Sequence, residues 1–100
     1  MASTKDLAAV KLSDFSPHLD EVFEMHTAGG VVPLKLAKAE SGGPAGREGG
    51  AFSLFFVAPV GPWMPQSIYP LKHPAFGTVE IFLVPIGPMF GGNCYQAVFG

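Results

Sequence analysis

The sequence has little charge and almost no cysteine. Charged residues make up 14% of its 100 residues, against about 25% in an average soluble domain. The net charge is −2 at pH 7, and the six Lys and Arg residues form no cluster, so no nucleic-acid partner is expected. Cys94 is the only cysteine, which excludes an intrachain disulfide and a cysteine-based zinc site.

Long apolar runs are also missing. No run approaches the roughly 20 residues that a membrane-spanning helix needs, so no membrane span is expected. The opening stretch MASTKDLAAVKL has no long apolar core, so we expect no signal peptide. The protein is therefore expected to be synthesised in the cytoplasm, whether it stays there or joins an extracellular or phage-like assembly.

Hydrophobic residues, glycine and proline are plentiful. Hydrophobic residues make up 48% of the chain, with 9 Phe, 13 Gly and 10 Pro. The length predicts a single β domain over residues 1–100. Gly and Pro lie between apolar runs, which is typical of short strands separated by turns. Low charge combined with many Phe favours a surface that another chain covers.

Apolar and polar residues alternate with the period of a β-strand in six segments. The predicted strands are residues 21–27, 31–40, 51–58, 66–73, 78–84 and 94–99. The connections after residue 50 are short, so we expect an antiparallel meander with an N-terminal hairpin added. The predicted fold class is all-β: a small antiparallel barrel or a two-layer β-sandwich of about six strands.

The remaining segments are predicted as loops and one helical turn. Residues 1–12 are expected to be frayed, and the Gly-rich residues 41–50 to form a flexible loop. The stretch LSDFSPHL predicts one short helical turn, with Phe15 and Leu19 tucked under the domain as a plug. In the strand 66–73, Ile68 is expected to point inward.

Several predicted strands are apolar on both faces. Val79, Ile81 and Leu83 share one face, while Phe82 and Val84 lie on the other. One helical turn cannot cover the second face of three strands, so we expect the chain to self-associate, with strands 52–58, 79–84 and 94–99 supplying much of the interface. The predicted interface residues are Phe55, Val57, Trp63, Met64, Phe82, Val84, Met89, Phe90 and Val98.

The loops 59–65 and 85–93 supply the aromatic and methionine residues of that set. Trp, Phe and Met are enriched in protein interfaces, so these loops are candidates for a contact surface. The alternative is that they fold back and cap the open ends of a barrel.

The candidates for chemistry have simpler structural explanations. A histidine metal site needs all three histidines, or two plus a carboxylate, to converge, and His18, His26 and His73 lie on separate elements without local pairing. His73 precedes a proline and is expected to hydrogen-bond across a turn. Cys94 is expected to be a buried structural thiol.

The charged and Gly-rich segments also lack a catalytic pattern. The carboxylates near the N-terminus are expected to be solvated; they are Asp14, Asp20, Glu21 and Glu24. The stretch SGGPAGREGG lacks the Gly-Lys-Ser/Thr ending of a phosphate-binding loop. We therefore expect no catalytic residue, no metal and no cofactor.

The second half of the chain resembles a known family. The segments PQSIYPLKHPAFGTVEIFLVPIGP and CYQAVFG are similar to that family's pattern of Pro-Gln-Gly-x-Tyr-x-Leu-x-His-Pro-x-Leu-Gly, Leu-Phe-Leu-Val-Pro-Val-Gly-Pro and Tyr-Glu-Ala-Val-Phe-Asn. Upstream, LSDFSPHLDEVFEM resembles the family's opening. Ser67, Gln96 and Gly100 depart from the usual Gly, Glu and Asn.

The family consists of small bacterial proteins catalogued as a domain of unknown function. The resemblance implies a common fold and encoding near tail-collar-like fibre proteins, but it implies no activity. We expect a non-enzymatic structural module that forms a homo-oligomer or filament, as a subunit of a fibre or phage-tail-like appendage, with a tail-collar-like fibre protein as a further partner. The alternative is a small-ligand-binding barrel or minor enzyme with a pocket near His73 and Tyr69.

Overall fold

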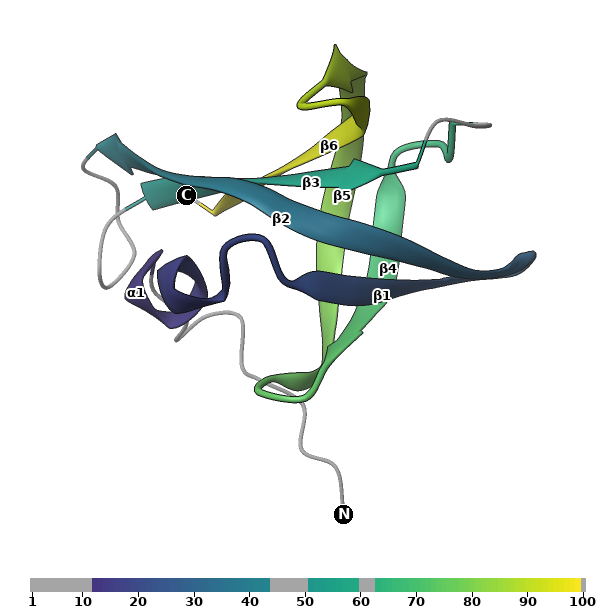
Figure 1. The fold of residues 1–100 in the computed structure, drawn as a ribbon, viewed down its shortest axis with the longest axis horizontal. Coiled ribbons are helices and arrows are strands. Elements are labelled where there is room, and N and C mark those ends of the chain that lie inside the picture. Colours follow the sequence, from purple (N-terminus) through teal and green to yellow (C-terminus); the bar gives the residue numbers. More distant parts are fainter. Residues whose placement is uncertain (1–11, 44–50, 60–62, 100) are drawn as a thin grey trace.

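Six antiparallel strands close into a barrel in the computed structural model, which describes residues 12–43, 51–59 and 63–99 (Figure 1). The barrel order is β1-β2-β3-β6-β5-β4. Residues 1–11 and 44–50, predicted as a frayed end and most of a flexible loop, lie outside the described residues. The elements are α1 (Leu12–Phe15), the 3₁₀ helix η1 (Ser16–His18), β1 (Val22–Thr27), β2 (Gly30–Gly43), β3 (Ala51–Ala58), β4 (Ser67–His73), β5 (Gly77–Met89) and β6 (Gly92–Phe99).

The all-β prediction is confirmed, and of its two alternatives the barrel is the one found. The meander is correct only for β4, β5 and β6, which follow one another as hairpins. It is wrong for β3, which pairs with β6 from Phe52↔Phe99 to Ala58↔Asn93 instead of pairing with β4. This pairing gives the last strand a second neighbour and leaves no free edge there.

The predicted N-terminal hairpin is present. β1 pairs with β2 from Val22↔Lys35 to Thr27↔Gly30, and Gly30 has a φ of 131° that favours glycine. The Thr27 hydroxyl donates to the Gly30 carbonyl over 2.7 Å. Pro33 lies where β2 has only β1 as a neighbour, because the pairing with β3 begins at Lys35. Thr27↔Gly30 closes a two-residue turn and is a hydrogen-bonded pair, so Pro33, three positions on, directs its nitrogen away from β1, and its missing N–H costs no sheet bond.

β5 is longer than predicted. The loop expected over residues 85–93 is wrong, because Pro85–Met89 continues β5 and pairs with β6, which starts at Gly92. β4 ends its pairing at Ser67↔Leu83, so the Pro85 segment has a neighbour on one side only. Prolines are tolerated on such an edge, and a bulge between Pro85 and Gly87 accommodates the first of them.

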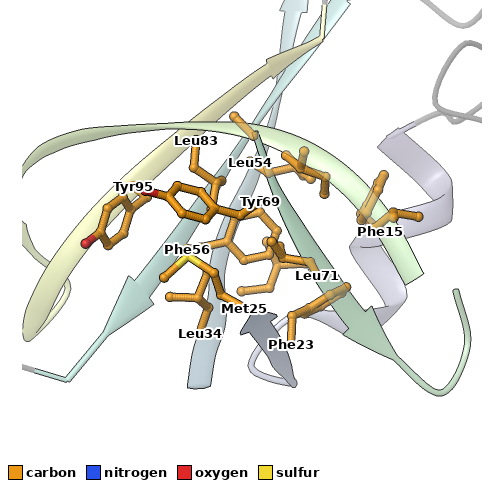
Figure 2. Close-up of a cluster of buried hydrophobic side chains, with 14 of the residues drawn as sticks. Phe15, Phe23, Met25, Leu34, Leu54, Phe56, Tyr69, Leu71, Leu83 and Tyr95 are labelled. Carbon is orange, nitrogen blue, oxygen red and sulfur yellow. The ribbon is translucent and has the colours of Figure 1, made fainter. Parts of the chain in front are cut away.

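The barrel interior is filled by the chain's own side chains (Figure 2). The inward faces of β5 and β6 agree with the predicted alternation, since Val79, Ile81 and Leu83 are buried, as is Tyr95. The prediction for Ile68 is wrong: it points outward and is 61% exposed, while Tyr69 and its alternate neighbours on β4 line the interior. Each large apolar side chain that is fully buried contributes about 1.5–3 kcal/mol relative to exposure.

The helical turn plugs one end of the barrel, as Figure 1 shows. Phe15 is fully buried and stacks on Phe76 with ring centroids 4.7 Å apart. Leu19 was expected in the same plug but is 41% exposed. The chain leaves η1 at this point through Asp20, whose φ of 69° turns it toward β1.

The barrel closes through a narrow seam between β1 and β4. Only Glu24↔Lys72 and Met25↔Leu71 are in register there, against seven pairs between β3 and β6. Pro70 follows in the direction in which pairing would continue, and it has no N–H to donate. The seam is therefore the weakest hydrogen-bonded contact of the closed sheet.

Gly92 lies very close to the end of β3. A Cβ on this residue would lie 2.3 Å from the Ala58 carbonyl oxygen and 2.7 Å from Val57 Cγ1. Only glycine allows the start of β6 to lie so close to the end of β3.

Candidate functional site

The outer wall of the barrel carries an apolar patch on β4, β5 and β6. Ile68 and Phe82 form a cross-strand pair and are 61% and 50% exposed. On the next strand, Val84 pairs with Gln96. Because β5 and β6 are antiparallel, the residue two positions beyond Gln96, Val98, lies on the side of Phe82, and it is 66% exposed. We call Ile68, Phe82, Val84 and Val98 the outer patch.

The other predicted interface residues lie in three settings. Val57 is buried within the chain, and Met64 packs against the core. Trp63 contacts Tyr95 with centroids 5.5 Å apart and is still 40% exposed. Phe55 is half-buried because its ring packs against Phe90. The second apolar face of β3 is thus covered largely by its own chain.

Met89 and Phe90 stand exposed where β5 turns into β6. Met89 pairs with Gly92, so the turn has two residues, Phe90 and Gly91. Their φ values are 56° and 87°, the left-handed pair that such hairpin turns require. A bulky residue with positive φ is an uncommon and strained choice. Beside it lies a shallow apolar groove of about 270 Å³, whose lining includes Val22, Lys35 and Phe90.

A second cluster joins three segments at the plugged end of the barrel. Glu21 Oε1 lies 2.9 Å from His18 Nδ1 and 2.7 Å from His73 Nε2. His18 comes from η1, Glu21 precedes β1, and His73 ends β4. The three possible ligand atoms all lie within 4.8 Å of one another. We call His18, Glu21 and His73 the His–Glu–His cluster.

The hydrogen bonds of the cluster define which nitrogen of His73 carries the proton. The Ala75 backbone N–H donates to His73 Nδ1 over 3.0 Å, so Nδ1 is an acceptor and the proton lies on Nε2. His73 therefore donates from Nε2 to the Glu21 carboxylate. This agrees with the predicted bond of His73 across its turn, but the Glu21 contact was not predicted.

Burial and charge differ across the cluster. The His73 side chain is 7% exposed and stacks on Phe23 with centroids 4.4 Å apart. Glu21 is 46% exposed and His18 24%. The hydrogen bond from His18, followed by that from His73, lowers the pKa of the Glu21 carboxyl below its ordinary 4.5. The carboxylate is thus ionised at neutral pH and open to solvent.

A family model described as a domain of unknown function, DUF6916, matches residues 10–99. The chain belongs to this family. The family suggested by the second half of the sequence is thereby confirmed as a domain of unknown function. Searches of the curated proteins and of the solved structures gave no match.

The two residues predicted near a ligand pocket, His73 and Tyr69, make separate contacts in this DUF6916 domain. Tyr69 donates its hydroxyl to the Pro65 carbonyl over 2.5 Å, and the Tyr95 hydroxyl accepts from the Met64 N–H over 2.8 Å. Burial raises the pKa of Tyr69, and the nearby Tyr95 raises it further. His73 instead belongs to the cluster around Glu21.

Cys94 lies on the opposite side of β6 from Tyr95 and is fully buried. Burial raises the pKa of its thiol. A thiol of this kind stays protonated at neutral pH and is a poor nucleophile, in agreement with the structural role predicted for it.

The other predicted candidates stay apart from the cluster. His26 lies beside Glu24 on β1, with Nε2 and Oε1 3.9 Å apart. Asp14 and Asp20 come from the helical turn and the bend that follows it. Within the part of the chain that the structure describes, no helix has the length and apolar character needed to span a membrane.

Sequence reasoning missed the His–Glu–His cluster and the exposure of Ile68. Glu21 and His73 are 52 positions apart, and they meet only because β1 and β4 are neighbours in the closed barrel. Knowledge of that adjacency would have predicted the contact, since Glu21 precedes one strand of the seam and His73 ends the other.

Proposed function

We propose that this DUF6916 domain is a non-enzymatic structural module that associates with itself through the outer patch. The observation that carries the proposal is the group of large apolar side chains on neighbouring strands, three of them at least half exposed. Such a group is unfavourable in water unless another surface covers it. A second copy is the proposed partner, because every copy presents the same face.

The surroundings of the outer patch support a contact larger than four side chains. A specific contact buries about 800 Å² per partner from some 20–30 residues. Met89 and Phe90 on the β5–β6 hairpin offer further exposed apolar surface on one of the same strands. Glu80 and Lys72, exposed on β5 and β4, would lie at the polar rim.

The kind of assembly depends on the symmetry of the contact. A two-fold contact closes into a dimer, whereas a head-to-tail contact that does not close gives a filament. The proposal extends to a subunit of a fibre, filament or phage-tail-like appendage, with a tail-collar-like fibre protein as a further partner.

The alternative is a ligand-binding barrel or minor enzyme with a pocket near His73 and Tyr69. Such a pocket needs at least about 300 Å³ and a few convergent polar groups. Tyr69 and His73 are four residues apart on β4, or about 13 Å at the usual rise of a strand. Each already bonds to its own chain, so this alternative is weaker.

The test is the mass in solution, measured by light scattering on a sizing column over a concentration series, with negative-stain images of the same fractions. Wild type is expected to exceed the 10.5 kDa of one chain, as a discrete oligomer or as filaments. Phe82→Asp and Ile68→Asp place a charge in the outer patch and are expected to give the monomer.

Val31→Asp is the matched control. Val31 is 54% exposed on β2, and β2 is three strands from β5 in either direction around the barrel. It should leave the mass unchanged. Circular dichroism should show folded β structure in all three variants, because the replaced side chains face water. A 10.5 kDa wild-type species at every concentration would contradict self-association.

A further inference from the structure

Two imidazoles and a carboxylate converge where the helical turn meets the barrel seam. We propose that His18, Glu21 and His73 form a binding site for a divalent transition-metal ion of the zinc type. The proposal is independent of self-association, because the outer patch and the His–Glu–His cluster share no residue.

The ligand set suits zinc. Imidazole nitrogens and carboxylate oxygens bind Zn²⁺ at about 2.0–2.2 Å, and two histidines with one glutamate leave a fourth position open to water. Ligands around a tetrahedral ion at these bond lengths lie about 3.3 Å apart. Glu21 Oε1 is 2.9 Å and 2.7 Å from the two imidazole nitrogens, so the carboxylate needs to move away from each of them by about half an ångström. The two imidazole nitrogens lie within 4.8 Å of each other.

The ligands are held in place on one side and open on the other. His73 is fixed by its stacking on Phe23, and the His18 ring meets His73 and Phe76 edge to face, at 4.9 Å and 5.2 Å. Rigid supporting contacts of this kind favour metal binding, because little order has to be created when the ion enters. Glu21, about half exposed, provides the route for the ion from solvent.

Metal binding has a specific consequence for His73. The ion needs the lone pair of Nε2, which in the metal-free chain carries the proton. That proton must move to Nδ1, and Nδ1 then cannot accept the Ala75 N–H. We therefore expect metal binding to break the His73–Ala75 hydrogen bond and to shift the turn between β4 and β5.

The same ion would connect the segments at the seam. β1 and β4 share two registered pairs, and the cluster joins the start of β1, the end of β4 and η1. A ligand that binds only the folded state stabilises it by mass action. The melting temperature is thus expected to rise with metal concentration.

The test uses tag-free full-length protein, stripped with a chelator and titrated with Zn²⁺ by calorimetry and with Co²⁺ by visible absorption. One ion per chain is expected. His18→Ala and Glu21→Gln are expected to weaken binding by at least about 100-fold, since loss of even an outer-shell partner costs about 10–100-fold. His26→Ala is the matched control and should bind as wild type does, because His26 is the one histidine outside the cluster.

The role of His73 is tested in the wild-type chain, because replacing this buried side chain would leave a cavity. Nitrogen NMR reports which of its two ring nitrogens carries the proton. The metal-free protein should show the proton on Nε2, and zinc should move it to Nδ1 together with a shift of the Ala75 amide. The proposal is overturned if neither metal binds, if His18→Ala binds as tightly as wild type, or if His26→Ala loses binding equally.

Discussion

Tyr69 is a buried residue whose surroundings oppose its ionisation. It is 7% exposed and donates to the Pro65 carbonyl. Burial and the neighbouring Tyr95 raise its pKa above the ordinary 10.0. An unfolded chain would ionise this group first, so alkaline solution favours unfolding. The contribution of Tyr69 to stability is complete below about pH 10 and is lost as the pH rises through the folded pKa.

This dependence can be measured by urea unfolding between pH 8 and pH 11, with the fluorescence of Trp63 as the signal. The free energy of unfolding of wild type is expected to fall with pH more steeply than that of Tyr69→Phe. Some slope should remain in the variant, because burial also raises the pKa of the Cys94 thiol above 9.0. If the free energy of unfolding fell equally steeply with pH in the two proteins, Tyr69 would ionise as readily in the folded chain as in the unfolded chain, which would contradict the prediction.

The turn of the β5–β6 hairpin places a bulky residue in a strained backbone conformation. Phe90 and Gly91 both have positive φ, which Asn-Gly adopts most readily in a two-residue turn. A left-handed conformation costs an ordinary residue about 1–2 kcal/mol. We therefore expect Phe90→Asn to raise the free energy of unfolding by about 1 kcal/mol and Gly91→Ala to lower it by a similar amount.

Denaturation midpoints of the two hairpin variants test these opposite signs. A Cβ added at Gly91 would meet no atom within 4 Å, so the effect of Gly91→Ala comes from the backbone conformation alone. A loss of stability in Phe90→Asn would mean that the contact of its ring with Phe55 outweighs the strain.

The same element shows where local pattern fails as a guide. The alternation of Thr78–Val84 predicted a strand correctly, but the prolines and glycines that follow predicted a loop where β5 continues. Those residues are compatible with a strand only because β4 no longer pairs there. Which strands are neighbours depends on the topology of the sheet, and the alternation of residues along one strand does not reveal it.

At the scale of the whole molecule, the sequence predicted the number of strands, the fold class and the inward faces of β5 and β6. It did not predict that β3 pairs with β6 or that Glu21 meets His73, because both depend on how the barrel closes. The outer patch could be predicted in part: Phe82 and Val98 followed from alternation, whereas Val57 is covered by its own chain and Ile68 was placed on the wrong face.

Closure through a seam of two registered pairs also predicts how the barrel opens. Local opening occurs where buried contacts and strand pairs are fewest, so β1 and β4 should separate before β3 and β6 do. In hydrogen exchange of wild-type protein, we expect the amides of Glu24 and Lys72, which form the hydrogen-bonded pair of the seam, to exchange faster than those of Leu54 and Ala97, which lie in the seven-pair ladder. Added zinc should slow the seam amides selectively if the His–Glu–His cluster binds it, because the ion would join the same two strands. Equal protection of both pairs at the level of global unfolding would mean that the barrel opens as one unit and that side-chain packing, not strand pairing, closes the seam.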